Sequence, residues 1–337
     1  MRAHATVSII VPCYNEVHTI GALLQALVVQ TAPLKELEVI VADGGSDDGT
    51  LQTLQTFAEG HPELRLQVVD NPARTIPAGL NLAIARATGE VVIRLDAHSA
   101  PQPDYVQRCL ETLNRTQAAN AGGLWDIRPG SDTWIGRSIA AAAAHPLGAG
   151  DARYRIQGTE GPVDTVPFGA YRREWLERVG GFNEGLLTNE DYEYNVRIRG
   201  LGGVIWFNPE IRSTYMARPD LPALARQYAR YGYWKARMLL RYSGSIRWRQ
   251  AIPPLFVLVT LGLLASSPWS VLARAGLAVE WAAYFAVLML FGCLESIKRR
   301  QLALLPGFPL AAVTIHLSWG SAFWLGLLSG LRRKPSD

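Results

Sequence analysis

The side chains best suited to chemistry in this sequence stand directly after short apolar runs. Asp96-Ala97-His98 follows Val91–Leu95, a run typical of a buried parallel strand. A carboxylate at the carboxyl end of a central strand lies where an open α/β sheet binds its ligand. Asp96 and His98 could both turn toward one divalent cation beyond the strand end. A strand that ends in a polar turn is the alternative, and for this short motif alone it is favoured.

Two more acids occupy equivalent positions earlier in the chain. Glu16 and Asp43 each follow a strand candidate, and Gly44-Gly45 after Asp43 would let the backbone approach a ligand closely. Each acid taken alone could belong to an ordinary turn. Three such acids (with Asp96) at one sheet edge favour a nucleotide site. The glycine spacing is not G-x-G-x-x-G, so a dinucleotide fingerprint is not indicated.

A third acidic motif, Glu190-Asp191, opens a helical pattern that begins near Asn189. Acids in the first turn of a helix are stabilised by the helix dipole, so ordinary capping is one interpretation. The other is that one of the two carboxylates acts as a general base, which needs a positioned acceptor of a proton.

The elements that must position these side chains alternate along the first hundred residues. Four strand candidates are separated by helical patterns that begin near Ile20, Leu51 and Ala78; the strands are Val7–Val11, Glu38–Ala42, Leu64–Val69 and Val91–Leu95. This alternation predicts an α/β fold, with a mostly parallel sheet and helices on both faces.

The composition changes near Asp220. Asp and Glu are frequent before it, whereas only Glu280, Glu295 and Asp337 follow it in a chain of 337 residues. The net charge of +4 is mild, and no nucleic-acid partner is expected. The three cysteines have no metal-ligand spacing and suit a reducing compartment.

The region after residue 220 has the features of a membrane segment. A helix over Leu221–Tyr242 would carry arginines along one face together with interfacial aromatic residues, which suits anionic headgroups, although a solvated basic face is the simpler interpretation. Three apolar segments follow, over residues 252–266, 275–294 and 302–331. If the first two form a hairpin, a crossing third segment would place Arg332-Arg-Lys334 outside, against the positive-inside rule; the alternative is a re-entrant third segment.

Three motifs carry a resemblance to a known family. Pro12-x-Tyr14-Asn15-Glu16, Asp43-Gly-Gly-Ser46-x-Asp48-Gly49-Thr50 and Arg94-Leu-Asp96-Ala-His98 resemble those of family 2 glycosyltransferases with the GT-A fold. More narrowly, they are similar to those of exopolysaccharide glucosyltransferases of the succinoglycan type. The resemblance covers roughly residues 5 to 240.

This resemblance implies roles for the donor side of the site. It implies that the base and ribose of a nucleotide-sugar are held by Pro12, Tyr14, Glu16 and Asp43. Asp96, Ala97 and Arg74 are also expected on the donor side, and a solvated loop arginine is the alternative for Arg74. The resemblance also implies that Asp96 and His98 take the place of the family's D-x-D and bind Mn²⁺ or Mg²⁺, although His98 departs from the acidic pattern. Either Arg74 or Arg94 could neutralise the diphosphate, and Arg94 could instead pair with a carboxylate.

On the acceptor side, the resemblance implies that Asp191 is the catalytic base and that Glu190 assists it. Gln227 and Arg230 loosely match a Q-x-x-R-W motif of processive synthases, on the acceptor or diphosphate side.

Together these features predict three regions: a GT-A catalytic domain (1–220), a basic, aromatic interfacial helix and linker (221–250), and a membrane region of two or three helices (251–337). The expected reaction is inverting transfer of a hexose, glucose from UDP-glucose, to a lipid-linked saccharide at the cytoplasmic face of the inner membrane. A polyprenyl-phosphate sugar transferase, a processive polysaccharide synthase and an inactive nucleotide-sugar-binding scaffold are the alternatives.

Overall fold

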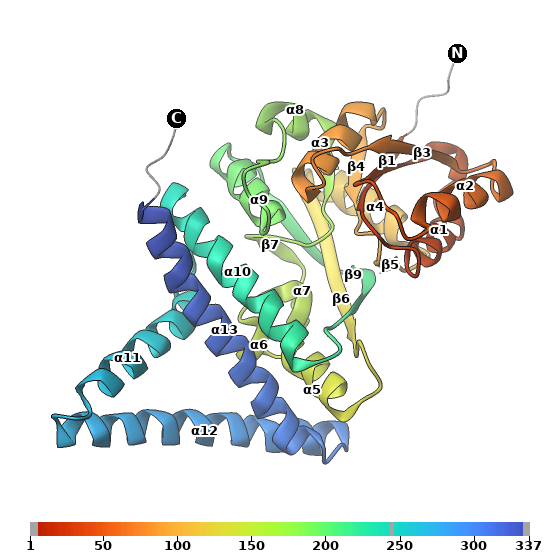
Figure 1. Cartoon of the computed structure of the whole chain (residues 1–337). Helices are drawn as coiled ribbons and strands as arrows, with labels where there is room; N and C mark the ends of the chain where they lie inside the picture. The colour runs from red at the N-terminus through yellow and green to blue at the C-terminus, as the bar shows by residue number, and fades with distance from the viewer. Residues whose placement is uncertain (1–5, 243–245, 333–337) are drawn as a thin grey trace. The chain divides into compact units, whose positions relative to one another are not determined.

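The computed structural model describes residues 6–242 and 246–332 (Figure 1). The chain forms two compact units, each built from two stretches of sequence. The first unit comprises residues 1–126 and 157–215, and the second comprises residues 127–156 and 216–337. The predicted boundaries at residues 220 and 250 stay predictions about domains. The first unit ends at residue 215, near the predicted boundary at residue 220. Residues 127–156 belong to the second unit.

One mixed sheet organises the first unit. In the described residues its strand order is β3-β2-β1-β4-β8-β6-β9-β5, with β7 paired to β9. The strands are β1 (Val7–Cys13), β2 (Leu37–Asp43), β3 (Arg65–Asp70), β4 (Val91–Arg94), β5 (Ala100–Pro101), β6 (Asn120–Arg128), β7 (Gly161–Val163), β8 (Ala170–Arg172) and β9 (Ile205–Met216). The first four strands are parallel, as expected, whereas β8 runs antiparallel to both β4 and β6.

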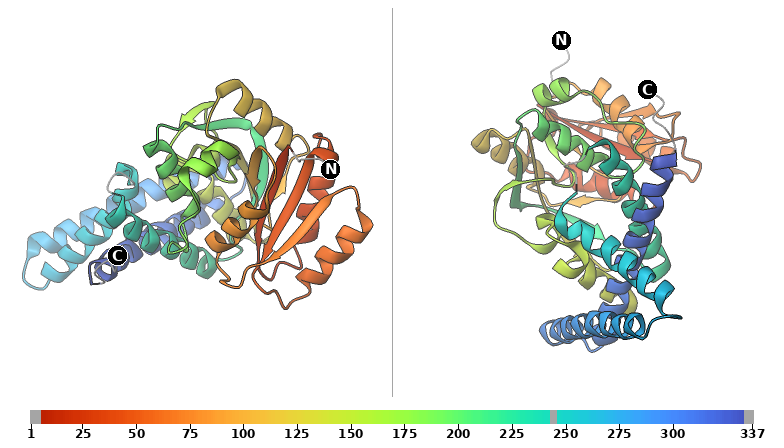
Figure 2. Two further views of the ribbon diagram at one scale, coloured as in Figure 1. Left: turned by 90° about the horizontal axis from the view of Figure 1, so that it is seen from above. Right: turned by 90° about the vertical axis from the view of Figure 1, so that its left-hand side faces the viewer.

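Helices cover both faces of the parallel strands (Figure 2). The helices of this unit are α1 (Ile20–Val28), α2 (Thr50–Gly60), α3 (Ile76–Arg86), α4 (Tyr105–Thr116), α8 (Arg173–Val179) and α9 (Glu190–Gly200). Val7, Ile9 and Val11 face the core shared with α1 and α4, while Ile10, one residue out of phase, is fully buried as well. This burial on both faces explains why the strands are continuous apolar runs.

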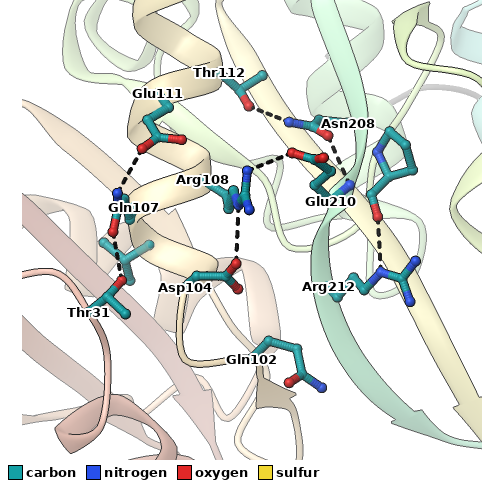
Figure 3. Close-up of polar contacts among 12 residues, drawn as sticks. Thr31, Gln102, Asp104, Gln107, Arg108, Glu111, Thr112, Asn208, Glu210 and Arg212 are labelled. Atoms are coloured by element: carbon teal, nitrogen blue, oxygen red, sulfur yellow. Dashed lines mark hydrogen bonds and ion pairs between the residues drawn. The ribbon is translucent and has the colours of Figure 1, made fainter.

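Helix α4 is tied to strand β9 by polar contacts (Figure 3). Arg108 donates to Asp104 at 3.1 Å and to Glu210 at 2.6 Å, and Asn208 donates to Thr112 at 2.8 Å in the interior. The exposed arginine pairs contribute little to stability, whereas the buried amide bond fixes the position of α4.

The segment that follows Asp96 is anchored to the same strand. In β5, Ala100 pairs with Thr214 of β9, and the Gln102 amide donates to the Arg212 carbonyl at 3.0 Å. The loop between β4 and β5, which carries Asp96 and His98, is therefore fixed at both ends.

The second unit is helical. In the described residues its helices are α5 (Trp134–Ala143), α6 (Pro146–Ala149), α7 (Arg153–Ile156), α10 (Leu221–Arg241), α11 (Ile252–Ser266), α12 (Val271–Arg299) and α13 (Leu304–Arg332). Their core joins α5, α10 and α13 through Ile139, Leu224, Phe308 and Ile315. By length and composition, three helices are able to cross a membrane, over Trp248–Ser266, Val271–Arg299 and Leu304–Leu331. The stretch 148–161 contains α7 and the start of β7.

Candidate active site

The acids predicted after the strands meet at one edge of the sheet. Asp43, the last residue of β2, lies beside Cys13 at the end of β1 and beside Asp70 at the end of β3. Asp96 follows β4 directly, where the Leu95 amide donates to the Ile10 carbonyl at 3.0 Å. Because these strands are parallel, their carboxyl ends form a single edge.

Asp43 shapes the glycine-containing loop that follows it. Its carboxylate accepts hydrogen bonds from the Gly45 amide at 2.8 Å, from the Ser46 amide at 2.9 Å and from the Ser46 hydroxyl at 2.5 Å. The side chain is buried, and Gly45 has a φ of +76°, a conformation that favours glycine. In this structure Asp43 therefore holds the loop by local hydrogen bonds.

Tyr14 and Arg74 line the loop from either side. A side chain on Gly44 would meet the Tyr14 ring at 3.2 Å, and a side chain on Gly45 would meet the Arg74 guanidinium at 3.2 Å. The Arg74 guanidinium carbon lies 6.0 Å from the centre of the Tyr14 ring, which is half exposed. Pro12, within β1, is partly buried next to them. The arrangement offers a ring, a cation and open backbone to a planar, anionic ligand.

His98 is paired with Glu16. Its Nδ1 lies 3.0 Å from Glu16 Oε1, and Glu16 also accepts a hydrogen bond from the Thr19 hydroxyl. Burial acts to raise the pKa of Glu16, but the bonds from His98 and Thr19 outweigh it and hold the pKa below its ordinary value. Glu16 is thus an anion that links the β1 and β4 loops. Ala97, between Asp96 and His98, is buried.

Arg94 joins the two acidic motifs. Its guanidinium donates to Asp96 Oδ1 at 2.8 Å, lies 3.0 Å from Glu190 Oε1 and forms an ion pair with Asp191. The Arg94 residue is only 3% exposed, so the three carboxylates supply the charge that its burial requires. Of the two roles considered for Arg94, the structure shows the second, the pairing with carboxylates.

The two acids of helix α9 are held in a buried, cationic setting. Burial raises the pKa of Glu190 to about 7, against the opposing effect of Arg94. Burial likewise raises the pKa of Asp191, and Arg94 opposes the shift there too. Arg94 therefore favours the anionic form of Asp191 that a general base requires.

Helix α9 is positioned by aromatic and amide contacts. Tyr194 stacks on Phe182 with ring centres 4.2 Å apart and packs edge-on against Tyr171 of β8. Asn195 accepts a hydrogen bond from Asn120 at 2.8 Å in the interior. Helix α9 begins after Asn189, which has a φ of +67° and makes no capping hydrogen bond with its side chain, and Glu190 and Asp191 lie in the first turn.

Sequence reasoning missed Tyr171. Its side chain is fully buried and interacts electrostatically with Asp191, and its hydroxyl has no hydrogen-bond partner in the part of the chain that the structure describes. Arg94 was easier than Tyr171 to single out from the sequence, because an arginine inside an apolar strand requires polar partners.

Asp96 is the side chain that suits a divalent cation. Among the described residues, no group of three or more His, Cys, Asp and Glu side chains is arranged to hold a metal ion. Such a group is not required, because Mg²⁺ is usually bound by one or two carboxylates together with substrate phosphates. Asp96 is partly exposed and bonds Arg94 through Oδ1. Asp96 therefore fits this type of site, whereas His98 directs Nδ1 to Glu16.

Gln227 and Arg230 lie on α10 in the second unit. Gln227 is buried and donates to the Tyr231 hydroxyl at 3.0 Å, and Arg230 is exposed. Their proposed acceptor or diphosphate role stays a prediction.

Known proteins with similar sequences identify the family. A sequence model described as glycosyl transferase family 2 matches residues 8–180. The succinoglycan biosynthesis protein ExoA of Rhizobium meliloti is 31% identical over 331 residues, which are 96% of this chain and 96% of that protein. The chain belongs to glycosyltransferase family 2.

Further relatives extend this family assignment. A dolichyl N-acetyl-alpha-D-glucosaminyl phosphate 3-beta-D-2,3-diacetamido-2,3-dideoxy-beta-D-glucuronosyltransferase of Methanococcus voltae is 26% identical, covering 76% of this chain and 80% of that protein. The mannosyltransferase PcManGT of Pyrobaculum calidifontis, solved with GDP-Man and Mn²⁺, superposes with a TM-score of 0.64 at 22% identity, over 93% of this chain and 87% of that one. TarS 1–349 of S. aureus with UDP-GlcNAc gives 0.53 at 17% identity, over 95% and 90%. These neighbours confirm the GT-A fold of the family 2 chain.

Proposed function

We propose that this family 2 enzyme transfers a hexose, glucose from UDP-glucose, to a lipid-linked saccharide, with inversion at the anomeric carbon. The observation that carries the proposal is the pairing of one buried guanidinium, Arg94, with Asp96 after β4 and with Asp191 at the start of α9. A transferase needs a donor-side carboxylate and an acceptor-side base close to one bond, and this pairing supplies both.

Asp191 is the base in this mechanism. Its carboxylate accepts the proton of the acceptor hydroxyl as that oxygen bonds to the anomeric carbon, while the bond from this carbon to the diphosphate oxygen breaks. Both electrons of the broken bond leave with UDP. Because attack comes from the side opposite UDP, a single displacement inverts the configuration. Glu190, bound to the same guanidinium, orients Arg94 and the start of α9.

Asp96 and the glycine loop serve the donor. Tyr14 and Arg74 flank the loop where the base and ribose of the nucleotide are expected, Asp43 holds that loop, and we assign Pro12 and Glu16 to the same donor side. A divalent cation held by Asp96 would supply Lewis-acid stabilisation of the departing diphosphate. The proximity of His98 to Glu16 supports a role for this imidazole in joining the two loops around the donor.

The helices after residue 246 support a lipid-linked acceptor and a membrane location. Three of them have the length and apolar composition of membrane spans. One relative is named for succinoglycan biosynthesis, and another for a reaction on a dolichyl-linked sugar phosphate. An acceptor anchored in a membrane would be held near an enzyme anchored in the same membrane. We place the enzyme in the inner membrane, acting on its cytoplasmic side.

The test is transfer by the purified full-length protein in lipid nanodiscs. It would be incubated with labelled UDP-glucose, UDP-GlcNAc or GDP-mannose and with either a lipid-diphosphate saccharide or polyprenyl phosphate. Transfer of glucose to the saccharide is expected, and this transfer should be lost in Asp191→Asn. Transfer to polyprenyl phosphate would favour the sugar-phosphate transferase. UDP binding without transfer to either acceptor would favour an inactive scaffold.

A further inference from the structure

Helices α10 and α13 lie side by side along most of the length of α10 (Figure 1). Both belong to the second unit. A side chain added at Gly232 would lie 2.3 Å from the Trp319 carbonyl oxygen, and one added at Gly326 would lie 2.3 Å from the Tyr233 carbonyl oxygen. The two backbones are therefore in direct contact, and one helix cannot be displaced along the membrane normal without the other.

Helix α10 is too strongly charged to lie in hydrocarbon. It spans 21 residues, about 30 Å at 1.5 Å per residue. It carries five basic side chains along this length: Arg226, Arg230, Lys235, Arg237 and Arg241. Burial of even one such charge at the bilayer centre is strongly unfavourable. A helix α13 that crossed the bilayer would draw α10 in with it.

The burial of α13 differs from that of the other two apolar helices. In its most apolar window 39% of the residues are buried within the protein, against 11% for the windows that contain α11 and α12. Phe308, Ala311 and Ile315 of α13 pack on the core formed with α5 and α10. Leu325 and Leu328 are exposed instead. Protein therefore covers one face of α13, and the other, apolar face is left to contact lipid.

The basic clusters fit the same arrangement. Arg247 and Arg249 precede α11, and Lys298-Arg299-Arg300 stand at the end of α12, while the turn between these helices exposes the Trp269 side chain (86%). Helices α11 and α12 form an apolar hairpin with five basic residues at its two ends and one, Arg274, beside its turn, a bias of the kind that the positive-inside rule describes.

We propose that α13 lies in the plane of the membrane interface beside α10, against anionic lipid, and does not cross the bilayer. The hairpin of α11 and α12 enters the hydrocarbon, and the chain therefore ends on the membrane face where α10 begins. This inference rests on the membrane association in the proposed function. It also resolves the conflict over Arg332-Arg-Lys334 in favour of a third segment that does not cross.

Cysteine labelling of the full-length protein tests the side on which the chain ends. In a Cys293→Ser background, Glu59→Cys marks the catalytic unit at an exposed position of α2, and Ser336→Cys marks the end of the chain. A membrane-impermeant maleimide should label both in inverted vesicles and neither in intact cells. Labelling of the two on opposite sides would overturn the inference. Recovery of the protein in the soluble fraction would overturn the membrane association beneath it, and neither readout depends on transfer.

A depth measurement tests α13 itself. Ser321 is exposed near the middle of α13, and Leu261 is exposed within α11. A fluorophore at Ser321→Cys should be quenched more strongly by quenchers at shallow positions on the lipid chains than by deep ones. The matched probe at Leu261→Cys should show the reverse order. Deep quenching at Ser321→Cys would show that α13 crosses.

Discussion

At the scale of single residues, Arg94 is the group on which the site depends. One buried guanidinium pairs with Asp96, Glu190 and Asp191, which come from segments nearly a hundred residues apart. Removing one partner of a buried charge pair leaves the other charges uncompensated, which is far more costly than loss of a surface pair. Substitutions within this group are therefore expected to affect stability as well as catalysis, so stability is measured beside the kinetics.

The first prediction concerns the base. Asp191→Asn keeps the shape of the side chain but cannot accept the proton, so kcat should fall by about a hundred- to ten-thousand-fold while the Kd for UDP is unchanged. The matched control is Glu174→Gln, an exposed acid in the first turn of α8, which should keep full activity. Steady-state kinetics and UDP titration measure the two effects. Near-normal kcat in folded Asp191→Asn would reject the assignment and direct attention to Glu190.

The second prediction concerns pH. Burial raises the pKa of Asp191 and Arg94 opposes this rise, so the acid limb of the kcat profile should lie above the ordinary aspartate pKa of 3.8. A base works only when ionised, so activity should rise as pH rises through this limb. In Arg94→Gln the opposing charge is gone, and the limb should move to higher pH.

Arg94→Lys is the control for this pH prediction, because it keeps a positive charge and should leave the limb close to that of the wild type. Arg94→Gln should also lose stability, about 3–5 kcal/mol for an uncompensated buried charge. Thermal unfolding measures that loss. An unshifted acid limb in a folded Arg94→Gln protein would contradict the electrostatic role of Arg94.

The third prediction concerns the cation. We expect EDTA to abolish transfer and Mn²⁺ to restore it at least as well as Mg²⁺, because the Asp96 carboxylate is a ligand that suits both cations. Asp96→Asn should weaken the response to Mn²⁺, measured as the concentration for half-maximal activity. Because His98 is bonded to Glu16, His98→Ala also tests whether the imidazole acts on the cation or on the loops. Full activity in EDTA would contradict the prediction.

At the scale of elements, the sequence supports local predictions better than distant pairings. The four apolar runs and the helix after Asn189 were predicted correctly because their patterns are local. The antiparallel position of β8, between β4 and β6, depends on pairing across about eighty residues, and no local pattern encodes it. The partners of Arg94 could not be predicted for the same reason, since Glu190 and Asp191 approach β4 only through tertiary packing of α9.

The fourth prediction concerns helix α13 as a structural element. Phe308 is fully buried in the core with α5 and α10, so Phe308→Ala should destabilise the protein by about 3–5 kcal/mol. Leu310, two residues along the same helix, is 45% exposed, and Leu310→Ala should have little effect. Thermal unfolding in one detergent compares the two. Equal losses would contradict the packing described for α13, and with it the view that α13 is more than a membrane anchor.

At the scale of the whole molecule, the chain combines a family 2 fold with apolar helices that its composition already signals after Asp220. The sequence could not show that residues 127–156 join the second unit, because that assignment depends on the packing of α5 against α13. Removal of the helices after residue 246 would therefore expose apolar side chains of α5 and α10.

The most direct test of the central claim is the configuration of the product. The full-length protein in nanodiscs would be given UDP-α-glucose and a lipid-diphosphate saccharide, and the new linkage would be assigned by NMR from its anomeric proton. With Asp191 as the only base and attack opposite UDP, we predict a β-linked glucose. An α-linked product would contradict the single displacement and the role given to Asp191.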